Sequence, residues 1–313
     1  MAFGTVISST LAGAITGAVL AGGSLALGAI SKALAPKLDD QARGRKEEVR
    51  SAVAPRTIVY GRARIAGTMV YAGAHGTDNK YLTMVFVVAG HEIDGFEKWF
   101  LNDDEVTLDA DGFVTAGRFS GKVRILTRLG AANQTALGLG VAEWTVNHKL
   151  LGLAHYAVRF EFDPEVFTNG RPRVDAVIRG AKLYDPREDA SVPGGNPVGT
   201  HVAGDPSTWQ WSNNWGLVML DYLKRDPLGA RLPLADIDIG AVVAAANISD
   251  EDVQLKGGGT HKRYTADGTV DTRAKRNGVL TNVLSAGAGQ LIYQGGKFTL
   301  YAGADSPAAI TLD

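Results

Sequence analysis

The stretch YLTMVFVVA, residues Tyr81–Ala89, is nearly continuous in apolar side chains. Its length suits a strand, and a run without alternation is typical of a strand that is buried on both faces. Shorter strand-like segments surround it, separated by turns rich in glycine and asparagine. The expected strands of this first half are Thr57–Tyr60, Thr68–Ala72, Tyr81–Ala89, His91–Leu101, Lys122–Arg128, His155–Phe162 and Arg173–Lys182.

A helical period follows a loop rich in proline and glycine, residues 185–207. Asn213 or Asn214 can cap a first helix that ends before Pro227. A second helix is expected from about Asp238 to Ala246, ending at Asn247. A third begins near Asp271 and ends at Gly287 or Gly289, and a hairpin follows with Gly295-Gly296 as its turn. The fold class predicted is α+β, rich in β-structure and with few helices.

The N-terminal segment differs from the rest because no side chain from Met1 to Ser31 is charged. We expect an apolar helical segment over 1–36, followed by a charged linker or helix over 37–56. Three interpretations remain open for the helix: a membrane span, a helix packed inside an oligomer, or a mobile tail. Small residues at helical spacing allow close helix packing, so the interface candidates are Gly13, Gly17, Ala14, Ala18 and Ala21.

Charge and composition exclude several classes of protein. The 313 residues include 32 basic and 33 acidic side chains, so no chain-wide basic field for nucleic acid exists, although a local basic patch is allowed. The absence of cysteine removes disulfides, thiolate metal sites and cysteine nucleophiles.

The chemistry-bearing residues form no recognisable catalytic pattern. The six histidines are scattered, and neither a nucleophile elbow nor a phosphate-binding loop is present. The carboxylate pairs, such as Asp103/Asp104, lie in polar turns that would not raise a pKa. Trp209, Trp211 and Trp215 are interpreted as core aromatics before a helix rather than a stacking surface. We therefore expect no enzyme activity, and no catalytic, cofactor-binding or metal residues.

Several sequence blocks, in order along the chain, resemble a family of phage proteins. They are Tyr60-Gly61-Arg62-Ala63-Arg64 with Gly67; His91–Gly95 through Trp99 to Val106; Arg179-Gly180 with Leu183–Arg187; Trp211–Asn214 leading to Leu220–Leu223; and Arg263-Tyr264, Gly268–Asp271, Leu284–Ala286 and Tyr293–Phe298. This ordered set, from about Ile58 to Ala304, resembles the tail tip attachment protein J of lambda-like long-tailed phages, the central baseplate hub. Trp215-Gly216 departs from the Pro-Ala usual in that family.

The resemblance implies a homotrimeric hub at the tail tip of a siphophage virion, built from tandem β-barrel-like domains. The partners implied are the distal tail protein ring, the tape measure protein and other tail tip and fibre proteins. Contact of the N-terminal segment with the host membrane is a further expectation, and no specific nucleic-acid binding is expected. Longer family members continue beyond the position of Asp313, so the chain is expected to be either a short hub or a fragment.

The predicted domains are a β-rich domain over 57–190, with an inserted subdomain about 95–170, and an α+β domain over 205–313. Arg179 and Arg187 are further interface candidates, and one or the other is expected to form an ion pair across domains or subunits. Two alternatives to the hub remain: a hub-associated enzyme that degrades the cell wall, and a membrane-anchored envelope protein.

Overall fold

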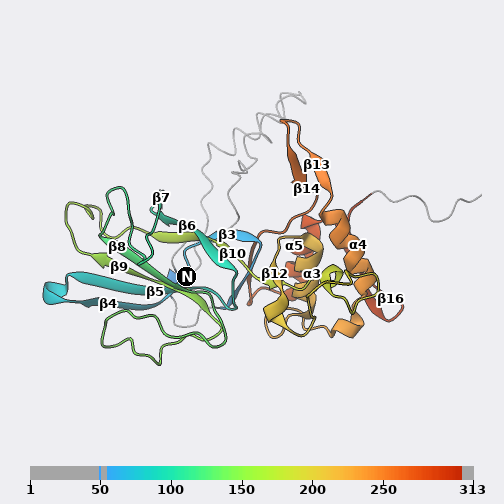
Figure 1. The fold of residues 1–313 in the computed structure, drawn as a ribbon, viewed down its shortest axis with the longest axis horizontal. Coiled ribbons are helices and arrows are strands. Elements are labelled where there is room, and N and C mark those ends of the chain that lie inside the picture. Colours follow the sequence, from blue (N-terminus) through green and yellow to red (C-terminus); the bar gives the residue numbers. More distant parts are fainter. Residues whose placement is uncertain (1–48, 51–54, 305–313) are drawn as a thin grey trace, which may run out of the picture. The chain divides into compact units, whose positions relative to one another are not determined.

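A computed structural model describes residues 49–50 and 55–304 of the chain (Figure 1). The described part contains three α-helices, two larger sheets and several two-stranded sheets, so the prediction of an α+β fold rich in β-structure is confirmed. The predicted N-terminal helix lies outside the described residues, together with its interface candidates Gly13, Gly17, Ala14, Ala18 and Ala21.

The first large sheet has five strands, and the apolar stretch that opens the sequence argument lies at its centre. All neighbours are antiparallel except the parallel pair at one edge, β1 and β4. In spatial order the strands are β1 (Val49–Arg50), β4 (Thr68–His75), β5 (Tyr81–Ala89), β9 (Ala154–Glu161) and β8 (Val123–Arg128). The predicted bounds of β5 are confirmed, because hydrogen bonding on both sides and burial on both faces leave a continuous apolar signal.

The second large sheet has four antiparallel strands. Their spatial order is β3 (Arg62–Ile65), β10 (Val174–Arg179), β6 (Gly95–Leu101) and β7 (Asp104–Val106). The turn between β6 and β7 is Asn102-Asp103, and both residues have positive φ.

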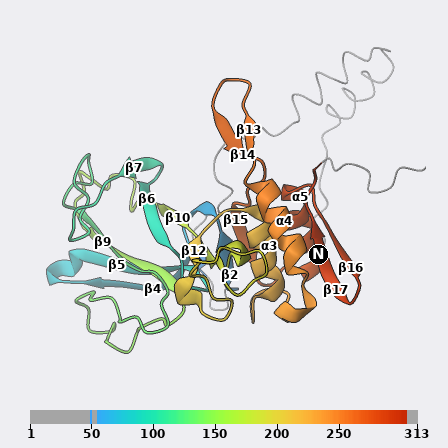
Figure 2. The same ribbon diagram turned by 45° about the vertical axis from the view of Figure 1, so that its right-hand side comes forward.

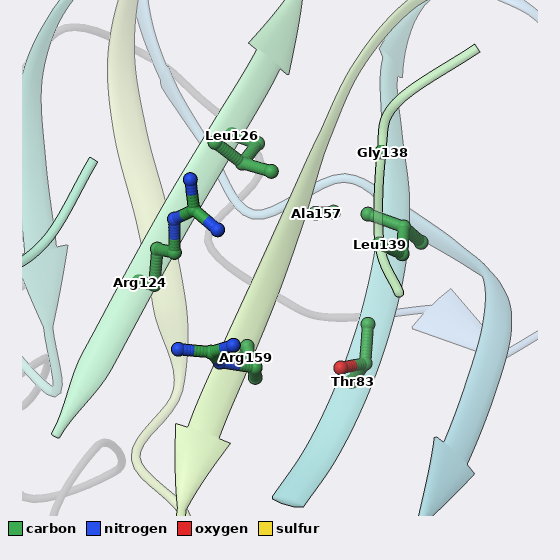
Figure 3. A pocket seen from close by; sticks show the side chains of 7 residues that line it. All are labelled: Thr83, Arg124, Leu126, Gly138, Leu139, Ala157 and Arg159. Atoms are coloured by element: carbon green, nitrogen blue, oxygen red, sulfur yellow. The ribbon is translucent and has the colours of Figure 1, made fainter. Parts of the chain in front are cut away.

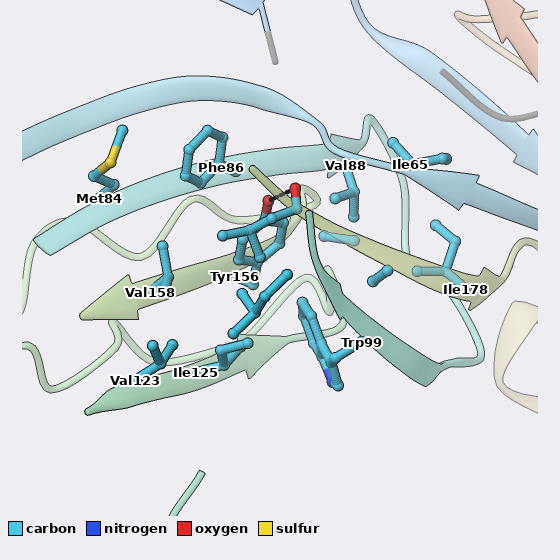
Figure 4. Close-up of a cluster of buried hydrophobic side chains, with 14 of the residues drawn as sticks. Ile65, Met84, Phe86, Val88, Trp99, Val123, Ile125, Tyr156, Val158 and Ile178 are labelled. Atoms are coloured by element: carbon cyan, nitrogen blue, oxygen red, sulfur yellow. Dashed lines mark hydrogen bonds between the residues drawn. The ribbon is translucent and has the colours of Figure 1, made fainter. Parts of the chain in front are cut away.

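The two sheets share one apolar core, in which their side chains point toward one another (Figure 4). Tyr156 of β9 stacks on Phe86 at 5.1 Å between ring centroids and meets the edge of Trp99 on β6 at 5.1 Å. Its buried hydroxyl donates to the carbonyl oxygens of Ala66 and Val174, at 2.6 and 3.1 Å. Tyr156 therefore links both layers.

The expectation of β-barrel-like domains is wrong for the described residues, because no sheet there closes on itself. Closure would require the edge strands to pair. Instead β8 and β7 are the end strands of separate sheets, and β8 meets only an isolated bridge from Phe113 to Arg124 on its outer side. A pocket lined by Phe96, Trp99, Ile125 and Thr127 lies beside them.

The second half packs three helices with small sheets. The helices are α3 (Trp215–Lys224), α4 (Ile239–Ser249) and α5 (Arg276–Ala286), and the hairpins are β13–β14 (Asp252–Gln254, Thr260–Lys262) and β16–β17 (Gln290–Gln294, Lys297–Tyr301). Two short pairs complete it, β11–β12 (Lys182–Leu183, Gln210–Trp211) and β2–β15 (Thr57–Tyr60, Gly268–Asp271). Short 3₁₀ turns cover Thr77–Asn79, Pro186–Glu188, Pro206–Thr208 and Leu234–Asp236.

Local signals located most of these elements. The Asn214 side chain accepts a hydrogen bond from Leu217 N at 3.3 Å, which confirms the predicted cap of α3. The predicted hairpin turn is also confirmed, since Gly295 and Gly296 have φ of 57° and 82°. Helix α4 runs two residues beyond its predicted end at Asn247.

The predicted start of the third helix near Asp271 is wrong. Gly268–Asp271 forms strand β15, which pairs with β2 near the beginning of the described chain, and α5 starts only at Arg276. A tertiary partner some two hundred residues away therefore overrides the local helical pattern.

The Tyr156 hydroxyl provides a test of the two-layer core. Tyr156→Phe should lower the free energy of unfolding by about 1–2 kcal/mol, because two buried carbonyl oxygens lose this donor. Tyr81→Phe is the matched control, since the Tyr81 hydroxyl has no hydrogen bond within the described part of the chain, and it should change stability by less than about 0.5 kcal/mol. Urea unfolding of both variants measures the difference. Equal losses in the free energy of unfolding would contradict the role of the Tyr156 hydroxyl in linking the two sheets.

Candidate functional site

Few side chains of the described residues are grouped in a way that suits metal binding or catalysis. Within residues 49–50 and 55–304, no three His, Asp or Glu side chains form a group suited to hold a metal ion. Over the same ranges, no helix is both long and apolar enough to cross a membrane. Each histidine has a ring nitrogen within hydrogen-bond distance of a nearby protein group; the six are His75, His91, His148, His155, His201 and His261.

Several of the blocks that carry the sequence resemblance meet at one place, which we call the junction. It joins the two-layer β-structure to the helices, and it is formed by Tyr60–Arg62, His91–Gly95, Arg179-Gly180, Trp211–Asn213, Asp221 and Ala266-Asp267. The chain changes sheet here: β2 pairs with β15, and the next strand, β3, pairs with β10.

Gly61 is the residue at which the chain turns from β2 into β3. Its φ is +55°, and a Cβ at this position would overlap Asp267 Oδ1 and the Ala266 carbonyl oxygen. Its own carbonyl accepts from Gly180 N at 2.7 Å and from the Trp211 indole at 3.2 Å. Only glycine allows both this backbone conformation and this close approach.

Two further hydrogen bonds tie the junction backbone together. Asp267 Oδ1 accepts from Arg62 N at 2.7 Å, which anchors the start of β3 to the segment before β15. On the other side, Asp94 N lies 2.9 Å from the Gly180 carbonyl oxygen. Gly180 is required for contact as well, because a Cβ there would overlap the carbonyl oxygen of Val59.

A buried polar triad lies under these backbone contacts. The Tyr60 hydroxyl donates to Asp221 Oδ2 at 2.7 Å, and Arg225 Nε donates to the same oxygen at 2.6 Å. Tyr60 and Asp221 are only 3% and 2% exposed. Burial raises the pKa of the Tyr60 hydroxyl well above its usual value, and the negative charge of Asp221 raises it further. Tyr60 therefore stays protonated and acts as a donor.

His91 completes the buried part of the junction as a neutral side chain. Its Nδ1 donates to the Glu92 carbonyl oxygen at 2.7 Å, and its Nε2 accepts from Val59 N at 2.9 Å. Burial, together with the positive charge of Arg225, lowers the pKa of His91 to about 4. A proton on Nε2 would also face the Val59 N–H, so the neutral ring is the form that fits.

The outer surface of the junction carries paired charges around Trp211. The guanidinium groups of Arg62 and Arg179 lie 5.9 and 5.8 Å from the centre of the Trp211 ring system. Arg62 pairs with Glu97 at 2.6 Å, and Arg179 pairs with Asp94 at 2.6 Å. Arg179 is thus bound within its own chain.

Arg187, the other described interface candidate, also has partners within the chain. It pairs with Asp185 at 2.7 Å and with Asp250, at the end of α4, at 2.8 Å. The second pair joins the segment after β11 to the helical half. A role of Arg179 or Arg187 between copies stays a prediction.

The hydrogen bonds described at the junction join segments that are far apart along the chain. The sequence indicated many of these residues only through the resemblance. It did not show that Tyr60 contacts Asp221, because the two are 161 positions apart. Arg225 and Asp267 lie outside the quoted blocks and were missed altogether.

Comparisons with known proteins give little for this chain. No protein-family model matches it, and no curated protein matches it. A solved structure titled "Virion of native gene transfer agent (GTA) particle" is similar, with a TM-score of 0.42 and 17% sequence identity. The match covers 96% of this chain and 66% of that one, so this chain spans just under two thirds of its length.

The lowered pKa of His91 predicts a pH dependence of stability. Between pH 6.5 and about 4 the unfolded chain binds a proton that the folded chain excludes, so this stability is present above pH 6.5 and is lost as the pH falls. When the pH falls from 7 to 5, protonation of His91 in the unfolded chain should lower the free energy of unfolding by about 2 kcal/mol.

His91→Gln tests this prediction, because the glutamine oxygen can still accept from Val59 N but does not titrate. His155 also has a pKa lowered by burial, so the wild type retains a second pH-dependent contribution, and the difference between the two proteins isolates His91. Urea unfolding at pH 7 and pH 5 measures it. Equal pH dependence in wild type and variant would contradict the assignment.

Proposed function

We propose that the chain is a structural virion protein, the homotrimeric central hub of a siphophage tail tip. In this role it closes the tail tube and links the tape measure and distal tail proteins to the parts that attach to the host. The ordered motif blocks support the proposal, and so does the way they are used, as the connection between two halves of one subunit rather than as a reaction centre. The division into domains at 57–190 and 205–313 is part of the proposal.

The observation that carries an assembly role is the surface of α4. This helix contains no charged side chain from Ile239 to Ser249. Its exposed positions are Gly240, Ala244 and Asn247, while Val243 and Ile248 are half-buried beside them. Surface helices normally present a charged or polar face to water, whereas on α4 only Asn247 among the exposed positions is polar. We infer that a neighbouring subunit covers α4.

The β13–β14 hairpin lies next to α4 in the sequence and supports the same inference. Both views show it projecting beyond the helices (Figures 1 and 2). All six of its strand residues are exposed, and Val253 and Leu255 are 38% and 51% exposed. An isolated two-stranded hairpin is marginally stable in water, so packing against another subunit is the arrangement that would stabilise it.

The α4 face and the hairpin both lie on the helical half. In the proposed trimer, contacts between subunits would be made by this half, and the junction connects it to the two-layer β-structure.

The mass of the full-length protein in solution tests this proposal. Light scattering should give about 99 kDa, three times the 33.0 kDa of one chain. Ala244→Lys places a charge on the proposed contact and should shift the mass toward 33 kDa, without loss of the monomer fold. Asn282→Lys, at an exposed position of α5, is the matched control and should remain trimeric.

A monomeric wild-type protein at micromolar concentration would contradict the trimer. A trimer that Ala244→Lys leaves intact would contradict the placement of the interface on α4. Circular dichroism of each variant verifies that the fold is retained.

A further inference from the structure

Two arginines face each other on the outer surface of the five-stranded sheet. Arg124 of β8 is the direct cross-strand partner of Arg159 of β9, and Arg159 is in turn the partner of Thr83 on β5. The three side chains form a row across three strands, opposite to the core. Figure 3 shows both guanidinium groups on the same side of the sheet, with Arg159 reaching toward β8.

Neither arginine has a carboxylate partner among the described residues. Arg124 Nε donates to the Asp111 carbonyl oxygen at 2.8 Å. Arg159 lies over the rings of Tyr81 and Phe113, at 4.8 and 5.6 Å from their centroids, and its guanidinium makes no hydrogen bond within residues 49–50 and 55–304. Most guanidinium donors of the two arginines therefore have no acceptor in the described part of the chain.

The cations next to this row behave differently. Lys80 and Lys122 both pair with Glu161, at 3.2 and 3.4 Å, and Lys122 also pairs with Asp163 at 3.1 Å. Like charges directly opposite on neighbouring strands are destabilising. Arg128 of β8 also has no carboxylate partner among the described residues, but its guanidinium donates to the carbonyl oxygens of Thr127, Thr135 and Ala136 and to the Thr135 hydroxyl. Arg124 and Arg159 thus differ from these neighbouring cations in having few acceptors.

The surroundings of the pair form a small pocket. Its walls are Leu126 and Ala157 of the sheet and Gly138-Leu139 of the loop that crosses it. The Thr83 hydroxyl is buried and lies 2.8 Å from His75 Nε2. Apolar walls around cations lower the local dielectric and strengthen the attraction for an anion.

We propose that Arg124 and Arg159 form a binding site for one phosphate group, either free or carried by a small molecule. Two fixed positive charges match the charge of a phosphate dianion, and guanidinium groups bind phosphate oxygens with paired N–H donors. A nucleic-acid backbone is disfavoured, because Glu161 and Asp163 flank the site and the net charge of the chain is −1.

The proposal goes beyond the hub function and can be tested without it. Thermal unfolding of the full chain is measured with inorganic phosphate, with potassium chloride keeping the ionic strength constant. A dissociation constant on the order of 1 mM would raise the Tm by about 3 °C at 10 mM phosphate. Acetate at the same concentration should give a smaller rise, since its single charge matches only one arginine.

Arg159→Gln and Arg124→Gln should each abolish the rise in Tm. Arg118→Gln is the matched control: Arg118 also lies over a phenylalanine ring, at 4.4 Å from Phe119, but has Asp104 as a partner at 3.6 Å. It should keep the full rise. Circular dichroism at 25 °C checks that each variant folds, and broadening of the phosphorus NMR signal of phosphate by wild-type protein gives a second measure of binding.

No rise with wild-type protein, or an equal rise in both glutamine variants, would overturn the proposal. Glycerol 3-phosphate in place of inorganic phosphate separates the two sources, and a rise with either one supports the site. Binding of duplex DNA that depends on Arg159 and exceeds the phosphate effect would also overturn it, because the ligand would then be a polyanion.

Discussion

The interaction on which the rest of the structure depends is the buried contact between Tyr60, Asp221 and Arg225. It joins β2, at the start of the described chain, to helix α3 in the second half. A buried carboxylate is stable only when it is fully paired, and here one oxygen of Asp221 accepts from both a hydroxyl and a guanidinium. The backbone contacts of Gly61 and Gly180 and the pairing of β2 with β15 can form only when these elements are held together.

The sequence predicts elements whose cause is local. Tyr81–Ala89 was found because a strand buried on both faces has a continuous apolar pattern, and α3 because Asn214 caps it. The start of α5 was misplaced since Gly268–Asp271 is held by β2, a partner that no local window contains. The β-barrel-like domains implied by the family resemblance are wrong for the described residues, because closure depends on which edge strands pair, and no short sequence block determines that pairing.

The two candidate sites differ in how far sequence could reach them. The motif blocks indicated the junction residues but not their contacts, because Tyr60 and Asp221 are far apart along the chain. The arginine pair left no sequence signal, since Arg124 and Arg159 become neighbours only through the register of β8 and β9. The composition nevertheless allowed for a local basic patch, and this pair is one.

The central claim, that the junction makes the two halves one cooperative unit, is tested most directly by hydrogen exchange of wild type and Asp221→Asn. In wild type the slowest amides of β5 and α3 should exchange with the same free energy of opening. In the variant those of α3 should exchange faster, by a factor of about 30 or more for a loss of about 2 kcal/mol, while those of β5 change less. The claim would be contradicted if the slowest amides of β5 and α3 had different free energies of opening in wild type. It would also be contradicted if both free energies fell equally in the variant.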